Sequence, residues 1–137
     1  MKVNVRWQDN VSFIGQSQSE HSYVMDGPED LGGKNKGMRP MEALLISIGG
    51  CTSYDVITIL KKSKQKIDDC DVIITAERVE TIPKVFNNIH IHFRVKGQNL
   101  SEDLVERAIK LSAEKYCSAS IMLGKSVEIT HDYELVK

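Results

Sequence analysis

One long helix is predicted from Pro40 to about Lys64, and it constrains the fold of this 137-residue chain more than any other feature. Pro40 suits the first turn of a helix, where a missing N–H costs nothing, and Glu42 complements the positive N-terminal end. Two glycines directly precede Cys51 inside this segment. Because a glycine within a helix costs roughly 1 kcal/mol relative to alanine, we expect that space is needed beside the sulfur.

Cys51 borders a polar stripe on the predicted helix. At about 100° per residue, the polar side chains nearest to the sulfur are those of Ser47, Tyr54, Asp55, Thr58 and Lys62. Another, broad side of the helix is apolar, and the remaining side carries Ile46 and Ile57. A helix with apolar residues on several sides needs covering on more than one face. In so short a chain this pattern suggests a partner subunit.

Alternation of apolar and polar residues with period two predicts β-strands before and after the helix. The clearest example runs from Asn88 to Lys96, where apolar residues alternate with histidine and basic side chains. Further strands are predicted at Lys2–Trp7, Val11–Gln16, His21–Asp26, Cys70–Glu80 and Ser126–Val136. The first two of these are separated by a short polar turn and indicate a β-hairpin.

A second helix is predicted from Ser101, a good N-cap, to about Tyr116, and a short helical turn ended by Gly124 follows it. The segment Gly27–Gly37 is rich in glycine and charge, so we expect an exposed, mobile loop there. The elements then follow the order strands, long helix, strands, helix, turn and strand. This order indicates an α+β fold with helices packed against antiparallel sheet.

Size and composition indicate a single globular domain over residues 1–137. The formal charge of -1, from 18 basic and 19 acidic side chains, produces no field that favours nucleic acid or an anionic membrane. The N-terminus lacks the apolar core of a signal peptide, and no uninterrupted apolar stretch reaches the about 18 residues of a membrane span. Three cysteines, an odd number, favour free thiols in a reducing compartment. We therefore expect a soluble, cytoplasmic protein.

The segment Gly37–Cys51, followed in the second half of the chain by Tyr116–Cys117, resembles the OsmC/Ohr family. The run Arg39-Pro40-Met41-Glu42 is most similar to the YhfA-type branch of that family. The likeness extends over nearly the whole chain and implies one OsmC-like domain. It also implies antiparallel sheets packed with a long central helix and a second helix, in an intertwined homodimer whose active sites lie at the subunit interface.

The resemblance further implies reduction of small organic hydroperoxides, in which Cys51 attacks the peroxide and Cys117 resolves the product. A thiolate attacks one peroxide oxygen to give a sulfenic acid, and a second thiol condenses with this acid to form a disulfide. This chemistry needs no metal and no organic cofactor. A dithiol reductant, either a small molecule or a protein, then restores the two thiols. The residues alone leave open which thiol attacks first, because a helical turn beginning at Cys117 would also lower a thiol pKa.

In peroxidases of this family an acidic residue directly follows the proline that begins the helix, and it holds an arginine against the reactive sulfur. That position is Met41 in this chain, so Arg39 and Glu42 are candidates for the cation and the acid. On the helical wheel Glu42 points about 180° away from Cys51, which leaves a pairing between Glu42 and Arg39. Arg6 is the only arginine in the early strands. The cation that activates Cys51 therefore stays open at this level.

The other reactive side chains have simpler interpretations. Cys70 lies between Asp69 and Asp71, whose carboxylates raise the pKa of a thiol, so we expect no chemical role for it. His90 and His92 share one face of a strand, where a solvated polar face is favoured over a metal site. An alternative function is a non-catalytic OsmC-like module that binds a small apolar ligand or senses thiol oxidation. An interaction-only protein is a weaker third possibility.

Overall fold

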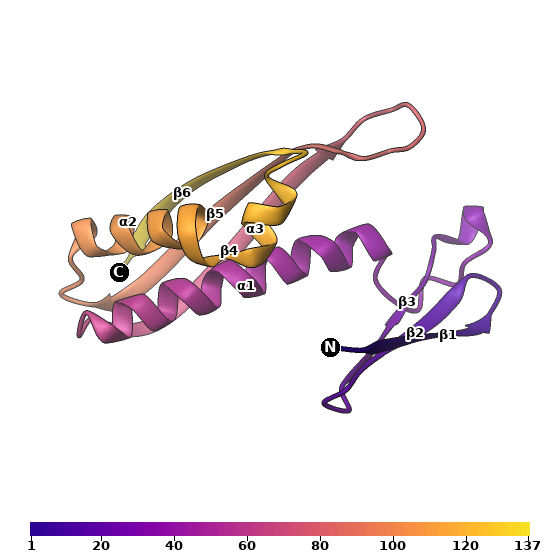
Figure 1. The fold of residues 1–137 in the computed structure, drawn as a ribbon, viewed down its shortest axis with the longest axis horizontal. Coiled ribbons are helices and arrows are strands. Elements are labelled where there is room, and N and C mark those ends of the chain that lie inside the picture. Colours follow the sequence, from indigo (N-terminus) through magenta and orange to yellow (C-terminus); the bar gives the residue numbers. More distant parts are fainter. The chain divides into compact units, whose positions relative to one another are not determined.

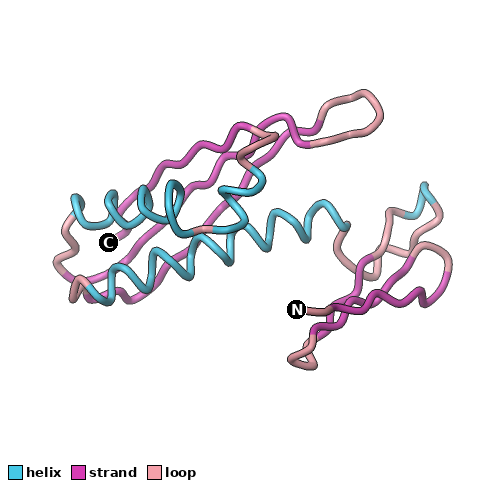
Figure 2. Tube along the Cα trace, viewed as in Figure 1, coloured by secondary structure: helices cyan, strands magenta, loops and turns pink.

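The computed structural model describes residues 1–137 and contains two compact units, Met1–Leu45 and Ile46–Lys137. The sheet of the first unit is formed by β1 (Val3–Asp9), β2 (Ser12–Ser17) and β3 (Ser22–Met25). The sheet of the second unit is formed by β4 (Lys66–Arg78), β5 (Phe86–Gln98) and β6 (Glu128–Val136) (Figure 1). The helices are α1 (Pro40–Lys62), α2 (Glu102–Leu111) and α3 (Ser118–Leu123) (Figure 2). Helix α1 begins in the first unit and continues into the second.

The first sheet is an antiparallel meander that begins with the predicted hairpin. Its register places Val5 opposite Gly15 and Trp7 opposite Phe13, and β3 then pairs with the other edge of β2. The turn between β1 and β2 contains Asn10 at a φ of 44°, a left-handed conformation that asparagine adopts more readily than most residues. The three strands predicted before the helix are therefore confirmed.

The loop after β3 is organised around the carboxylate of Asp26. This side chain accepts hydrogen bonds from the backbone N–H groups of Gly27, Lys34 and Lys36, at 2.7, 3.2 and 3.2 Å. Asp26 is only 3% exposed, and the hydrogen bond from Gly27 contributes most to lowering its pKa. A short 3-10 helix, Glu29–Leu31, lies within the same loop. Alternation places Asp26 at the end of a strand and does not reveal that its side chain ties the loop together.

Helix α1 begins at Pro40, as predicted, and ends two residues before the predicted Lys64. Lys64 itself has a positive φ of 60°, so the right-handed helix cannot continue through it. Every fourth side chain from Ile48 onward is fully buried within the second unit, as the list Ile48, Thr52, Val56 and Leu60 shows. The length and apolar composition of α1 would also suit a membrane span. The buried stripe instead identifies α1 as a core helix.

The second sheet is built on the long antiparallel pair of β4 and β5. Strand β4 begins at Lys66, four residues before the predicted Cys70. The register shifts between Ile67 and Asp69, and this irregularity interrupts the alternation that the prediction relied on. In β5 the predicted alternation is confirmed: Ile89, Ile91, Phe93 and Val95 are buried. Helices α1 and α2 cover this buried face of the sheet (Figure 1).

Strand β6 pairs with β5 in the parallel direction, with Ile91 opposite His131 and Phe93 opposite Tyr133. The α+β class is confirmed, but the expectation of purely antiparallel sheets is corrected here, because the second sheet is mixed. A parallel neighbour needs a crossover connection, and α2 with α3 supplies it between β5 and β6. Period-two alternation is the same for both directions, so the sequence pattern could not distinguish them.

A candidate two-thiol site

The second unit brings the thiols of Cys51 and Cys117 together. Cys51 is partly buried on α1, whereas Cys117 follows α2 and is 0% exposed. The two side chains lie close enough for Cys51 to raise the pKa of the Cys117 thiol, and both cysteines are free. A thiol pair in contact meets the first geometric requirement for forming a disulfide without large movement.

Cys117 is positioned by a π-helical turn, Ser112–Tyr116, that directly follows α2. Its backbone N–H donates to the carbonyl oxygen of Ser112 at 2.8 Å, five residues earlier. The sequence predicted one regular helix to about Tyr116, and this part of the prediction is wrong because the α-helix ends at Leu111. Short π-helical turns are rare and frequently occur at functional sites. Here the turn widens the backbone immediately before the buried thiol.

A buried polar network joins this turn to α1 next to Cys51. The hydroxyl of Ser112 lies 2.8 Å from the hydroxyl of Thr52, and it also donates to the carboxylate of Asp55 at 2.9 Å. Ser112 and Thr52 are both fully buried. Asp55 belongs to the polar stripe predicted on the helix, but the roles of Ser112 and Thr52 were missed. No sequence pattern marks them, because the π-helical turn is defined by backbone hydrogen bonding.

The environment of Cys117 both opposes and favours its ionisation. Burial is the largest influence and raises the pKa of the Cys117 thiol, and Cys51 raises it further. The side chain of Ser120 and the hydrogen bond from its backbone N–H act in the opposite direction and lower this pKa. The net direction is upward, so Cys117 is mainly a neutral thiol at neutral pH.

The two glycines before Cys51 lie in different surroundings. A Cβ atom on Gly49 would lie 2.6 Å from the end of the Ile74 side chain, which reaches across from β4. A Cβ atom on Gly50 would meet nothing within 4 Å. Gly49 is therefore required by the close approach of Ile74, whereas a side chain at Gly50 would enter open space.

Arg39 and Glu42 contact each other at the start of α1, in the first unit. The Glu42 carboxylate accepts the backbone N–H of Arg39 at 2.8 Å, which is the reciprocal half of a capping box. The guanidinium of Arg39 donates to the side-chain oxygen of Asn35 at 2.8 Å and to the carbonyl oxygen of Gly37 at 3.2 Å. These contacts stabilise the first helical turn and the end of the preceding loop.

Cys70 and the strand histidines lie in other surroundings. The pKa of Cys70 is raised mainly by burial and then by Asp69 and Asp71, so it agrees in direction with the sequence argument. On the open face of the second sheet, His90 and His92 of β5 contact acidic side chains of the neighbouring strand β6. Hydrogen bonds between the two strands form a polar ladder that joins His90 to Thr130 and Asp132, His92 to Asp132 and Glu134, and Arg94 to Glu134.

Comparison with known proteins agrees with this architecture. The family of OsmC-like proteins matches residues 33–132. Protein YhfA of Escherichia coli K12 is 45% identical over 136 residues, which cover 99% of this chain and 98% of YhfA. A crystal structure of a protein from Aquifex aeolicus VF5 has a TM-score of 0.83 at 31% identity and covers 99% of this chain and 97% of that one.

The fold also matches a protein named for hydroperoxide resistance. The organic hydroperoxide resistance protein OhrB of Bacillus subtilis has a TM-score of 0.64 at 15% identity and covers 97% of this chain and 96% of OhrB. At this low identity the likeness concerns the fold alone. The YhfA match and the family match confirm the resemblance first noticed in the helix that carries Cys51. This chain belongs to the OsmC family.

Proposed function

We propose that this protein reduces small organic hydroperoxides with Cys51 and Cys117. The single observation that carries the proposal is the proximity of two free thiols, close enough for Cys51 to raise the pKa of Cys117. Membership of the OsmC family supports it, because members of that family include proteins named for organic hydroperoxide resistance. Two neighbouring thiols are sufficient for the two-electron reduction of a peroxide, because together they supply both electrons and form a disulfide.

This reaction needs only the two thiols, the hydroperoxide and a dithiol reductant. The Cys51 thiolate attacks one oxygen of the hydroperoxide, the O–O bond breaks, and the other oxygen leaves as an alcohol after taking a proton. Cys51 then carries a sulfenic acid. The sulfur of Cys117 attacks the Cys51 sulfur, a disulfide forms, the S–O bond breaks, and water leaves. A dithiol then reduces the disulfide and becomes oxidised itself.

The different surroundings of the two sulfurs support the assignment of roles. Cys51 is partly exposed, so a small hydroperoxide has access to it. Cys117 is fully buried and its pKa is raised, which disfavours it as the first nucleophile. A buried thiol already in contact with Cys51 is suited to the second step, which needs no access from solvent.

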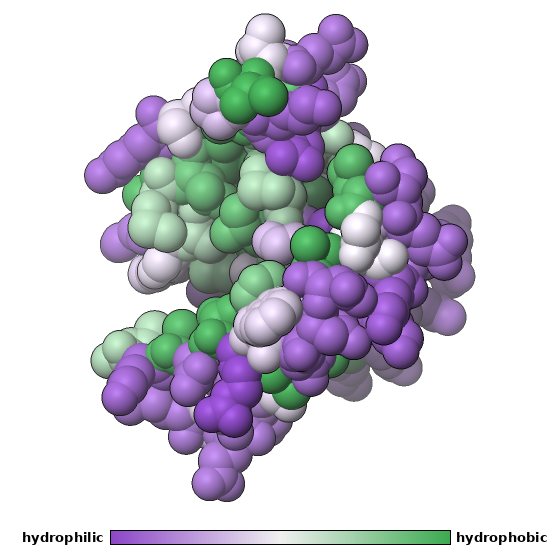
Figure 3. Space-filling model, turned by 90° about the vertical axis from the view of Figure 1, so that its right-hand side faces the viewer, coloured by the Kyte–Doolittle hydropathy of each residue, from purple (hydrophilic) through white to green (hydrophobic).

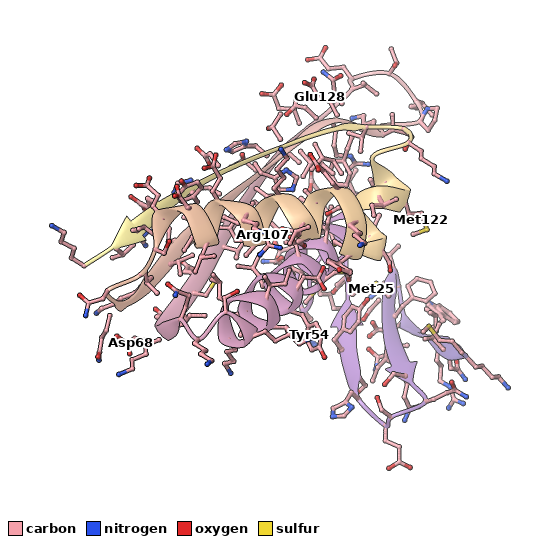
Figure 4. The ribbon with its side chains drawn as sticks, turned by 60° about the vertical axis from the view of Figure 1, so that its left-hand side comes forward. Met25, Tyr54, Asp68, Arg107, Met122 and Glu128 are labelled. Carbon is pink, nitrogen blue, oxygen red and sulfur yellow. The ribbon has the colours of Figure 1, made fainter.

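We further propose that the protein works as a homodimer formed from OsmC-like domains of residues 1–137. In the first unit, Trp7 on β1 is 63% exposed, and in the second, Ile46 and Tyr54 on α1 are 58% and 74% exposed. Tyr54 projects from α1 in Figure 4, and apolar residues are visible on the surface in Figure 3. Large exposed apolar side chains on a core helix support a covering partner. Light scattering measures the expected dimer mass directly.

The test of the peroxidase uses purified protein, cumene hydroperoxide and dithiothreitol. We expect Cys51→Ser to abolish Cys-dependent turnover. After one equivalent of hydroperoxide, we expect Cys117→Ser to accumulate a sulfenic acid on Cys51 that dimedone traps, whereas the natural protein forms a disulfide. Cys70→Ser is the matched control and is expected to behave like the natural protein. Turnover that persists in Cys51→Ser would reject the proposed nucleophile.

One observation favours a second candidate, a sensor of thiol oxidation in the same reducing, cytoplasmic setting. The raised pKa of Cys117 slows its attack, so an oxidised Cys51 would persist longer than in a fast peroxidase. The two functions differ in rate. Stoichiometric oxidation of Cys51 without repeated turnover under dithiothreitol would identify the sensor, and continuous consumption of hydroperoxide would identify the enzyme.

A further inference from the structure

Ser120, in α3, has a buried hydroxyl without a hydrogen-bond partner in the protein. The residue is 5% exposed, and its Oγ atom neither donates nor accepts a hydrogen bond of regular geometry. Burial of an unpaired hydroxyl costs free energy, and native proteins pair most such groups. The position of Ser120 therefore calls for an explanation other than the stability of the helix.

The explanation lies in the sulfur of Cys117, three residues earlier. The backbone N–H of Ser120 donates to Cys117 Sγ at 3.4 Å, and the side chain of Ser120 acts on the same sulfur. The Ser120 side chain lowers the pKa of Cys117, against the larger effect of burial. A neutral thiol is a weak acceptor, whereas a charged acceptor makes a hydrogen bond roughly twice as strong. The hydroxyl thus gains a proper partner when Cys117 loses its proton.

We propose that Ser120 is a catalytic residue of the resolving step, in which its hydroxyl and its N–H together hold Cys117 as a thiolate. This inference rests on the proposed two-cysteine function. The Cys117 thiolate attacks the Cys51 sulfenic acid, the S–S bond forms and the S–O bond breaks. The departing hydroxide takes a proton and becomes water. When a dithiol later attacks Cys51 in the disulfide, Cys117 leaves as a thiolate and receives the same two hydrogen bonds.

The same donors act in both directions because the charge on Cys117 is the feature shared by resolution and reduction. No cation is among the groups that shift the pKa of Cys117. Uncharged donors can stabilise a thiolate in a buried site without leaving a charge unpaired after the disulfide forms. This arrangement suits a sulfur that alternates between a neutral thiol, a thiolate and a disulfide.

The first experiment measures ionisation of Cys117 without any turnover. The background is the full chain carrying Cys51→Ser and Cys70→Ser, so that Cys117 is the only thiol. Its ultraviolet thiolate absorbance is titrated with and without Ser120→Ala. We expect Ser120→Ala to raise the pKa of Cys117 by about one unit, since a hydrogen bond to a charged group is worth at least that much. Ser118→Ala, at an exposed position of the same helix, is the matched control.

The second experiment follows the rate of disulfide formation after one equivalent of cumene hydroperoxide, in the Cys70→Ser background. A thiol with a higher pKa is ionised less but is more nucleophilic once ionised. For a shift of about one unit, Ser120→Ala should be about threefold slower below both pKa values and about threefold faster well above them. A variant that merely displaces Cys117 would be slower at every pH. The thermal midpoint of Ser120→Ala should not fall, because the lost hydroxyl has no partner.

The outcomes separate this inference from the proposed function. An unchanged titration of Cys117 in Ser120→Ala overturns the inference, whether or not the protein reduces hydroperoxides. A uniform loss of rate at all pH values also overturns it, because it indicates displacement of the sulfur. A raised pKa in a protein that shows no turnover supports the Ser120 hydrogen bond and rejects only the peroxidase.

Discussion

The Oγ atoms of Ser112 and Thr52 lie 2.8 Å apart, although 60 positions separate the two residues in the sequence. Thr52 directly follows Cys51 on α1, and Ser112 begins the π-helical turn that ends at Cys117. One buried hydrogen bond therefore joins the two backbone segments that carry the thiols. The relative position of the two thiols therefore depends on how α1 packs against the π-helical turn.

This relationship predicts a loss of stability when either hydroxyl is removed. We expect Ser112→Ala to lower the free energy of unfolding by about 1 to 3 kcal/mol, because Thr52 keeps a buried hydroxyl that loses its partner. The double variant Ser112→Ala with Thr52→Val should lose less than the sum of the single variants, because no unpaired hydroxyl remains. Urea denaturation measures all three. Additive losses would show that the two hydroxyls do not interact, and Ser118→Ala serves as an exposed control.

The capping contact of Glu42 predicts a structural effect that can be separated from activity. Glu42→Ala removes the acceptor of the Arg39 N–H, and we expect a loss of about 1 kcal/mol in the free energy of unfolding. Glu42→Gln keeps an oxygen acceptor and should retain both stability and hydroperoxide turnover. If Glu42→Gln folds normally but loses turnover, the charge of the carboxylate has a chemical role. Glu42 would then be the acidic residue of the active site.

The two adjacent glycines of α1 predict opposite responses to alanine. Gly50→Ala enters open space, so the higher helix propensity of alanine should stabilise the protein by up to about 1 kcal/mol. Gly49→Ala places a methyl group 2.6 Å from the end of Ile74, and the required shift should offset that gain. Adding Ile74→Val removes the close atom and should recover the stability. Equal effects of the two alanines in thermal unfolding would contradict this difference.

The ladder of β5 and β6 predicts how stability depends on pH. The pKa of Asp132 is lowered chiefly by the hydrogen bond from His92, and the pKa of His92 is raised chiefly by the same contact. The contribution of Asp132 is therefore present above about pH 4 and is lost as the pH falls through its lowered folded pKa. The contribution of His92 is fully present below about pH 6.5 and is lost as the pH rises through its raised folded pKa.

The ladder should therefore stabilise the protein most between about pH 4 and pH 6.5. We expect the thermal midpoint of the natural protein to exceed that of Asp132→Asn by the largest margin in this window. The margin should shrink at high salt because these side chains are exposed to solvent. A margin that does not vary with pH would show that the ladder does not couple protonation to folding.

The elements that the sequence predicted well depend on short-range patterns. Pro40 marks the start of α1 because its ring sets the backbone locally, and the alternation around Ile91 identifies a half-buried strand without knowledge of its neighbours. The start of β4 was missed because a bulge near Asp69 interrupts the alternation. The parallel pairing of β6 was missed because a strand's own pattern does not record the direction of its partner.

By itself the sequence determined the α+β class, the long helix and the family, and it offered Cys51 and Cys117 as candidate reactive thiols, because these follow from local periodicity and from a linear motif. The tertiary structure alone decided that the two thiols meet, that a π-helical turn presents one of them, and that Ser120 is buried against it. These features arise from contacts between segments far apart in the chain or from backbone hydrogen bonding that side-chain periodicity does not encode.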